Sequence, residues 1–247
     1  RATSAETLAL WQAQARAGLR RLLGIDRIAV EAAGHRPAVE LGEGETVDEG
    51  IVRRRGTIET EPGFVVPFYL LEPAGGGPHP LALTPHGHAA TGAETSAGVF
   101  PDDDTRARML AEDRDVAVQA ARRGYLAIAP TVRGTGSIGL HDLSGRHDRD
   151  CRAHAMHCLL AGRTATGERV WDTMALIDWA LETFELDETN ILCMGNSGGG
   201  MVTTYAAAID PRIATAIASC SFAPFVAADG FILHCDCNQV PGIMRYG

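Results

Sequence analysis

Apolar positions in the first third of the chain predict a helix followed by a hairpin. Residues 4–23 carry apolar side chains at helical spacing, which predicts an amphipathic helix, and Gly24 is placed to cap its C-terminus. Two strand-like runs follow, Ile51–Thr60 and Phe64–Leu71. The residues between them, Glu61-Pro62-Gly63, are typical of a tight turn, so we expect an antiparallel β-hairpin.

Beyond the hairpin, short runs that are apolar throughout alternate with helical segments. The predicted strands are Leu81–Thr84, Tyr125–Ala129, Ile191–Met194 and Ile213–Ser219. The predicted helices are Thr105–Arg123, Val170–Phe184 and Gly199–Ile209. Strands that are apolar on both faces and separated by helices indicate a parallel sheet covered on both sides. The pattern predicts an α/β fold: a three-layer sandwich around a mostly parallel sheet, with an antiparallel hairpin at its N-terminal end.

No internal repeat or low-complexity linker divides the chain, so we expect one domain over residues 1–247. Residues 1–50 form its N-terminal extension, a helix followed by a loop in the Gly- and Glu-rich stretch Gly42–Gly50. Residues 51–247 form the core.

The net charge and the few clustered basic residues exclude some classes of binding partner. The net charge is −9, and the one short basic run, Arg53-Arg54-Arg55, falls on the solvent side of a predicted strand. Nucleic-acid binding requires clustered basic residues, and a membrane span requires about 18 consecutive apolar residues. We therefore expect neither a nucleic-acid partner nor a membrane. The six cysteines do not form the pattern of a disulfide-rich domain, which favours a reducing, cytoplasmic location, although removal of a leader before Arg1 stays open.

One serine stands among glycines where a predicted strand meets a predicted helix. Gly195-Asn196-Ser197-Gly198-Gly199 has the G-x-S-x-G pattern in the strand–turn–helix context of a nucleophile elbow. Glycines on either side of the serine let the strand and helix approach too closely for a Cβ atom, and the serine hydroxyl is held exposed above the sheet. We therefore expect Ser197 to be a nucleophile rather than part of an ordinary tight turn.

The loop after an earlier strand supplies candidate partners for this serine. It reads Pro85-His86-Gly87-His88, where Gly87 allows the backbone close to a substrate. We expect the backbone N–H groups of His88 and Gly198 to form an oxyanion hole. The imidazoles of His86 and His88 either line the pocket or only form local hydrogen bonds.

Arg133 follows another predicted strand, and two roles fit it. Its guanidinium lines the substrate pocket and binds a substrate carboxylate, or it forms a surface ion pair with Asp142 or Asp148.

Taken together, these features resemble a known family. A strand–elbow–helix unit with an upstream His-Gly is the pattern of the α/β-hydrolases. Further segments are similar to bacterial hydrolases related to dienelactone hydrolase and acetyl xylan esterase: Gly162-Arg163-Thr164, Glu168-Arg169-Val170-Trp171-Asp172, Asp178-Trp179 and His234-Cys235-Asp236-Cys237-Asn238-Gln239-Val240-Pro241-Gly242. The resemblance runs from about Phe64 to the C-terminus and implies a serine ester hydrolase with the α/β-hydrolase fold.

The chain departs from the family after the elbow. In the superfamily, an acid and then a histidine follow the serine, on loops after two further strands. Fifty residues follow Ser197, and His234 is the only histidine among them. We expect the chain to stop before the family's acid and histidine, so that the fold is truncated at its C-terminus. The alternative is that His234 completes the triad with Asp236 or Asp229.

Histidines and cysteines gather in two segments, and neither matches a recognised zinc motif. The first segment contains His141, His147, Asp148, Asp150, Cys151, His154, His157 and Cys158. The second is His234-Cys235-Asp236-Cys237, whose C-x-C spacing is weak for zinc. We expect polar loop packing in the first and a structural loop beside the pocket in the second, with His234 near the substrate. The sequence thus predicts no metal and no cofactor.

The sequence predicts hydrolysis of a carboxylic ester through an acyl-enzyme on Ser197, with a small-molecule ester or an acetylated sugar as substrate. A serine peptidase or a lactone hydrolase would use the same groups. A non-catalytic binding protein on the same fold is the alternative from another class. We expect the pocket walls to come from Thr91–Asp104, Ser137–Thr164 and Phe222–Gly247.

Overall fold

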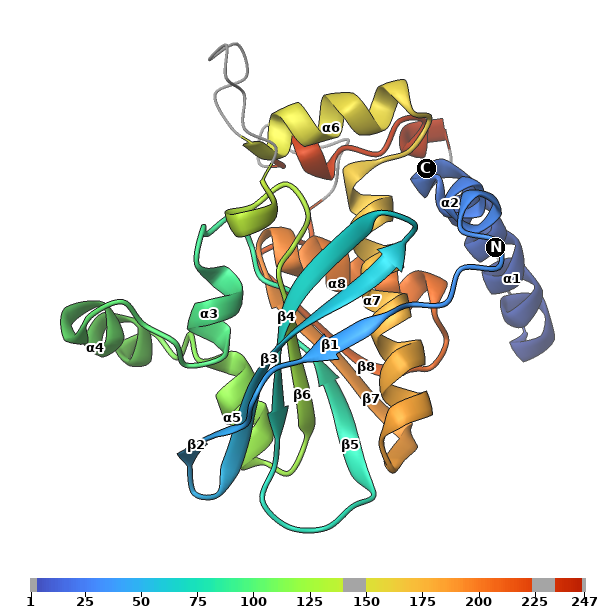
Figure 1. Cartoon of the computed structure of the whole chain (residues 1–247). Coiled ribbons are helices and arrows are strands. Elements are labelled where there is room, and N and C mark those ends of the chain that lie inside the picture. The colour runs from blue at the N-terminus through green and yellow to red at the C-terminus, as the bar shows by residue number, and fades with distance from the viewer. Residues whose placement is uncertain (1–3, 140–149, 224–233, 246–247) are drawn as a thin grey trace.

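A mixed eight-stranded sheet forms the centre of the protein (Figure 1). The structure is a computed structural model and describes residues 4–139, 150–223 and 234–245. Its strands are β1 (Val39–Leu41), β2 (Glu45–Asp48), β3 (Ile51–Glu61), β4 (Phe64–Glu72), β5 (His79–Leu83), β6 (Leu126–Pro130), β7 (Leu186–Asn196) and β8 (Ile213–Ser219). The spatial order is β1-β3-β4-β6-β5-β7-β8, and β2 also pairs with β3.

The strand directions divide the sheet into two parts. β6, β5, β7 and β8 pair in parallel, as expected for strands that are apolar on both faces. β1 to β4 pair antiparallel, and β4 joins the two parts by pairing antiparallel with β6. The predicted hairpin is confirmed: β3 and β4 meet at Pro62-Gly63, where Gly63 adopts a positive φ of 79°.

Helices cover both faces of the sheet. They are α1 (Ala5–Leu23), α2 (Ile25–Glu31), α3 (Gly92–Ser96), α4 (Asp103–Ala111), α5 (Val116–Arg122), α6 (Asp150–Leu160), α7 (Ala165–Thr183) and α8 (Gly198–Ile209), with short 3₁₀ turns η1 (Gly136–Ile138), η2 (Asp236–Asn238) and η3 (Ile243–Arg245). In Figure 1, α7 and α8 lie on one face of the sheet and α3 and α5 on the other. Each face has its own apolar core, so the predicted three-layer α/β fold is confirmed.

The predicted helix Thr105–Arg123 is wrong as a single element. It is broken into α4 and α5, and Asp113 between them has a positive φ of 53°. The polar stretch at residues 112–115 interrupts the apolar periodicity, and α4 buries none of its residues whereas α5 packs on the sheet. One continuous helix could not leave α4 in solvent and also pack α5 on the sheet.

The N-terminal region contains more structure than a helix and a loop. Gly24 ends α1 in the left-handed conformation, as predicted, but the chain enters α2 directly. β1 and β2 pair with β3, so the sheet begins before residue 51. Both strands are short and largely exposed, which is why their apolar pattern is weak. None of the helices in the described part of the chain is long and apolar enough to cross a membrane.

Candidate active site

Ser197 occupies the turn between β7 and α8. Its backbone has φ 57° and ψ −118°, a conformation that side-chain-bearing residues rarely adopt and that costs on the order of 1–3 kcal/mol. The Ser197 N–H donates to the carbonyl oxygen of Ser219 at the end of β8, with a distance of 2.8 Å. The residue is exposed at the C-terminal end of β7.

The glycines on either side of Ser197 allow backbone contacts that a side chain would prevent. A Cβ atom at Gly195 would lie 2.5 Å from the carbonyl carbon of Gly199, and one at Gly199 would lie 2.0 Å from the carbonyl oxygen of Pro85. The expected elbow geometry, with strand and helix too close for a Cβ atom, is therefore present. The turn packs directly against the backbone of the loop that follows β5.

That loop also approaches the serine itself. A Cβ atom at Gly87 would lie 3.4 Å from Cβ of Ser197 and 3.6 Å from the backbone nitrogen of Gly198. Gly198 is the first residue of α8, where the N–H groups lack partners within the helix. The expected oxyanion donors, the N–H groups of His88 and Gly198, thus belong to two segments that are in contact beside Ser197.

His86 is buried and links two loops. Its Nε2 accepts a hydrogen bond from the Val132 N–H at 3.1 Å, and its Nδ1 lies 2.7 Å from the Gly87 carbonyl oxygen, to which it must therefore donate. Burial lowers the pKa of His86 to about 4, so the ring is neutral. Of the two expectations for the His86 ring, these contacts correspond to local hydrogen bonding: Nδ1 bonds within the loop after β5, and Nε2 links that loop to the loop after β6.

The His88 ring lies between the elbow and a group of cysteines. A Cβ atom at Gly198 would lie 3.1 Å from its Cε1 atom, while its Nε2 lies 3.0 Å from Sγ of Cys237. Hydrogen bonds with Cys235 and Cys237 raise the pKa of His88 to about 9. The His88 side chain therefore has a defined partner in Cys237.

Arg133 is not a pocket residue, because its side chain is only 2% exposed and lies among carboxylates. Its Nε and Nη2 donate to Asp172 at 2.7 and 2.6 Å. Its Nη1 lies 3.3 Å from Glu168 and 2.7 Å from Glu61, the latter as an ion pair without hydrogen-bond geometry. The guanidinium also stacks on Phe64, 3.8 Å from the ring centroid.

These contacts make Arg133 a structural cation that joins β3 to α7, and they correct its predicted role as a pocket residue. The other predicted role, a surface ion pair with Asp142 or Asp148, involves acids that lie outside the described residues.

No base is hydrogen-bonded to the serine in the part of the chain that the structure describes. The Ser197 hydroxyl forms no hydrogen bond with a side chain there. His234 is buried, and its Nε2 lies 3.3 Å from the carbonyl oxygen of Ala223. Asp229, one of its expected acid partners, lies outside the described residues. Asp236 is paired with Arg152 on α6, so it does not support a triad.

A surface hollow of about 550 Å³ lies beside α4, lined by residues such as Arg53, Phe100 and Arg106. It includes part of one expected pocket wall, Thr91–Asp104, but not Ser197. We base the site on the elbow geometry, because the two other expected walls run through residues outside the described part of the chain.

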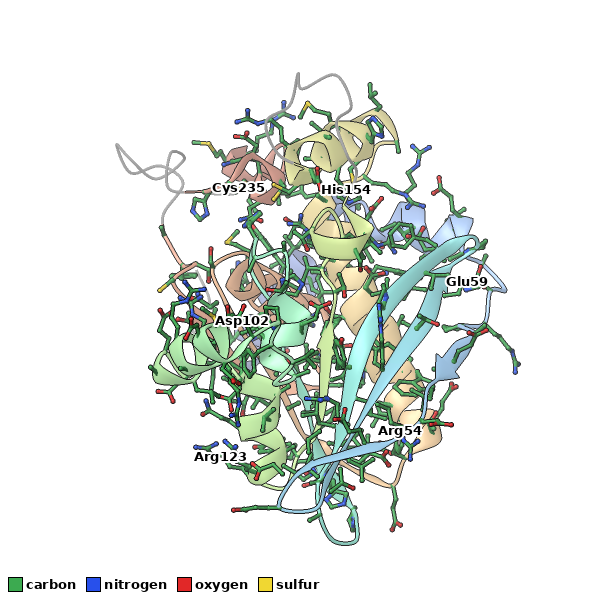
Figure 2. The ribbon with its side chains drawn as sticks, turned by 60° about the vertical axis from the view of Figure 1, so that its left-hand side comes forward. Arg54, Glu59, Asp102, Arg123, His154 and Cys235 are labelled. Carbon is green, nitrogen blue, oxygen red and sulfur yellow. The ribbon has the colours of Figure 1, made fainter. Side chains whose placement is uncertain are left out.

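The most evident omission from the sequence prediction is a four-residue group of thiols and imidazole. His88, Cys151, Cys235 and Cys237 place their donor atoms within 4.8 Å of one another. The four residues come from three separate segments, so no spacing motif joins them. Cys151 and the C-x-C pair fall in the two segments rich in histidine and cysteine, but no spacing links them to each other or to His88. Figure 2 shows Cys235 beside α6, the helix that carries Cys151.

The comparisons with known proteins agree with this fold. The family model for acetyl xylan esterase (AXE1) matches residues 109–228, which include the elbow. No curated protein matches the chain in sequence.

Several solved structures share the fold. A Bacteroides fragilis NCTC 9343 protein assigned to the acetyl xylan esterases is 18% identical, with a TM-score of 0.65 over 84% of this chain and 52% of that chain. Methylesterase BT1017 is 22% identical, with a TM-score of 0.63 over 90% and 43%. Acetyl xylan esterase 1 from Thermoanaerobacterium sp. JW/SL YS485 is 20% identical, with a TM-score of 0.54 over 79% and 55%.

The chain therefore has the α/β-hydrolase fold, and its sequence resembles the acetyl xylan esterase family over residues 109–228. It spans about half the length of these three solved structures.

Proposed function

We propose that the chain carries the nucleophile of a carboxylic ester hydrolase and that Ser197 is that nucleophile. The observation that carries the proposal is the backbone conformation of Ser197. This exposed residue has φ 57° immediately before α8. Such strain persists only where the surroundings enforce it, and it is concentrated at functional sites. An ordinary turn would place glycine at this position.

The chemistry follows from the groups around the serine. Ser197 Oγ attacks the acyl carbonyl carbon, and a general base takes its proton. The carbonyl oxygen becomes an oxyanion that accepts hydrogen bonds from the N–H groups of Gly198 and His88, next to the positive end of the α8 dipole. The alcohol leaves with a proton, and water then releases the acid from the acyl-enzyme.

The substrate class comes from the comparisons. Acetyl xylan esterases give both the family match and two of the similar structures, which supports an acetylated carbohydrate. A methylesterase is also similar in fold, so a methyl ester is the second candidate.

A fluorophosphonate probe on the longest natural form of the protein that contains this chain tests the nucleophile, since it reacts only with an activated serine. We expect a single adduct, which peptide mapping by mass spectrometry places on Ser197. Ser219→Ala is the matched control, because Ser219 is an exposed serine at the end of the neighbouring strand β8. This variant should be labelled as wild type, whereas Ser197→Ala should not be labelled.

Turnover then separates the substrates. An acetylated xylo-oligosaccharide should release acetate at least about tenfold faster, by kcat/KM, than the methyl ester of a uronate releases methanol. The reverse order would favour the methyl ester. No adduct and no turnover on any ester would instead favour a non-catalytic binding protein.

A further inference from the structure

Three parts of the chain meet at a group of sulfur and nitrogen donors beside the elbow. His88 comes from the loop after β5, Cys151 from the first turn of α6, and Cys235 and Cys237 from the segment around η2. Cys151 and Cys237 are buried, with 3% and 1% exposed. Figure 2 shows that this region lies at one end of the molecule, where α6 covers the segment that contains Cys235.

The four donor atoms lie close enough together to surround one metal ion. Zinc–sulfur bonds of about 2.3 Å and zinc–nitrogen bonds of about 2.0 Å imply donor separations of about 3.5–3.8 Å in a tetrahedral site. Sγ of Cys151 lies 3.8 Å from Sγ of Cys235, which matches such an edge. Nε2 of His88 lies 3.0 Å from Sγ of Cys237, which is a hydrogen-bond distance and shorter than such an edge. All four donor atoms lie within 4.8 Å of one another, so small side-chain rotations close the site.

We propose that His88, Cys151, Cys235 and Cys237 bind one zinc ion. Three thiolates and one imidazole form a Cys₃His donor set, which is typical of structural zinc because all four positions are filled by protein. Binding involves no change of oxidation state. Each thiol that is still protonated loses its proton to water as the Zn–S bond forms, and a protonated His88 ring likewise releases the proton on Nε2 as the Zn–N bond forms.

The surroundings of the donors suit an anionic metal site. Three thiolates with Zn²⁺ carry a net charge of −1, and the buried guanidinium of Arg169 lies beside them. Its Nη1 donates to Sγ of Cys237 at 3.2 Å and to Oδ1 of Asn238 at 3.3 Å. Hydrogen bonds to a coordinating sulfur stabilise its charge and fix its orientation. A purely apolar packing of the cysteines would not require a buried cation at this point.

Hydrogen bonds also fix the segment that supplies two of the ligands. Thr166 Oγ1 on α7 donates to the Cys237 carbonyl oxygen at 3.3 Å, and Arg152 on α6 pairs with Asp236. The segment around η2 is therefore held against both helices, and the metal would add a third attachment to the loop after β5.

The position of His88 indicates what a bound zinc ion would do. Nε2 of its ring faces Cys237, and the adjacent Cε1–Nδ1 edge packs on Gly198 next to Ser197. Zinc bound at Nε2 would fix this ring and, with it, the backbone of the loop that packs on the elbow. The ion would act as a structural element that positions the loop, and it has no open position for a substrate.

A second group of side chains that could bind a metal lies nearby, but its carboxylate already forms ion pairs within the protein. It consists of His154, Cys158 and Glu168. Glu168 is paired with Arg133, Arg163 and His154, so its carboxylate is neutralised without an ion. We therefore assign the metal to the Cys₃His group.

Metal content and cobalt spectroscopy test the proposal on the full chain. The protein is purified with a phosphine reductant, its zinc is measured by mass spectrometry, and the metal-depleted protein is titrated with Co²⁺. We expect about one zinc per chain and, with cobalt, the intense visible and near-ultraviolet bands of a tetrahedral thiolate site. Chelation should lower Tm by about 5 °C or more, and added zinc should restore it.

Substitutions locate the ligands. Cys235→Ser and His88→Ala should each reduce bound zinc to less than about a tenth of wild type. Cys220→Ser, an exposed cysteine outside the group, and Cys158→Ser, in the neighbouring group, should keep it. If a ligand variant fails to fold, the cobalt spectrum of the wild type still shows whether the protein has a tetrahedral thiolate site.

Three results would overturn the proposal. One is a reduced wild-type protein that binds neither zinc nor cobalt. Another is zinc retained by Cys235→Ser or lost from Cys158→Ser. The third is a Cys151–Cys235 disulfide in protein that gains no metal after reduction, which would identify the pair as a redox device.

Discussion

A Cβ atom on Gly199 would lie 2.0 Å from the carbonyl oxygen of Pro85. The first turn of α8 therefore packs directly on the backbone of the loop after β5. Because Gly87 and His88 continue that loop, this contact sets the distance between the serine and one of its expected oxyanion donors. The elbow and the loop act as one unit, and changes at their contact should affect stability and activity together.

Gly199→Ala should lower the free energy of unfolding by about 3 kcal/mol or more, although alanine is normally favoured over glycine in a helix. The added methyl group meets backbone atoms, which cannot move aside like a flexible side chain. Urea unfolding followed by circular dichroism measures the change. Gly76→Ala is the control, since a Cβ atom there has no neighbour within 4 Å, and it should change stability by less than about 0.5 kcal/mol. A Gly199→Ala protein as stable as this control would contradict the elbow packing.

Arg133→Met should destabilise the protein by about 3–5 kcal/mol, because it leaves the carboxylates of Glu61, Glu168 and Asp172 buried without their shared cation. Arg133→Lys should destabilise the protein less than Arg133→Met, because lysine keeps the positive charge. It should still be less stable than wild type, because lysine lacks the planar fork that binds Asp172.

The same urea titration on Arg114→Ala provides the comparison for Arg133. Arg114 forms an exposed pair with Glu112, worth no more than about 0.5 kcal/mol. Equal losses at positions 133 and 114 would show that the buried network does not hold β3 to α7.

Glu168 should make stability depend on pH in the acid range. Burial raises the pKa of Glu168, but the hydrogen bond from His154, the charges of Arg133 and His154 and the hydrogen bond from Arg163 outweigh burial and lower it to about 2, from 4.5. The unfolded chain therefore binds this proton first as pH falls. The stabilisation is fully present above about pH 4.5 and is lost as pH falls towards 2.

Comparison with Glu168→Gln isolates this effect. Between about pH 5 and about pH 3.5, the free energy of unfolding should fall by about 1 kcal/mol more in wild type than in the variant. Parallel curves for the two proteins would rule out a lowered pKa for Glu168.

The sequence predicted the parts of the fold that depend on local pattern. The hairpin at Pro62-Gly63, the parallel strands and the elbow were all found, because turn residues and apolar runs determine them locally. The break at Asp113 and the short strands β1 and β2 were missed, since tertiary packing rather than periodicity decides them.

Buried polar contacts were the harder part of the site to predict. Arg133 was expected in a pocket or at the surface because a charged residue after a strand is usually exposed. Its burial depends on Asp172, Glu168 and Glu61, which come from separate elements. The Cys₃His group was missed for the same reason: it is formed by proximity in space and not by spacing in the chain.

The most direct test of the account is the hydrolysis of an aryl acetate by wild type and Ser197→Ala, using the longest natural form of the protein that contains this chain. The variant should fold as wild type, by circular dichroism and Tm, and its kcat/KM should fall by about 10³-fold or more, because the nucleophile is lost and only oxyanion stabilisation is left. A folded Ser197→Ala protein that hydrolyses the ester at the wild-type rate would contradict the assignment of Ser197.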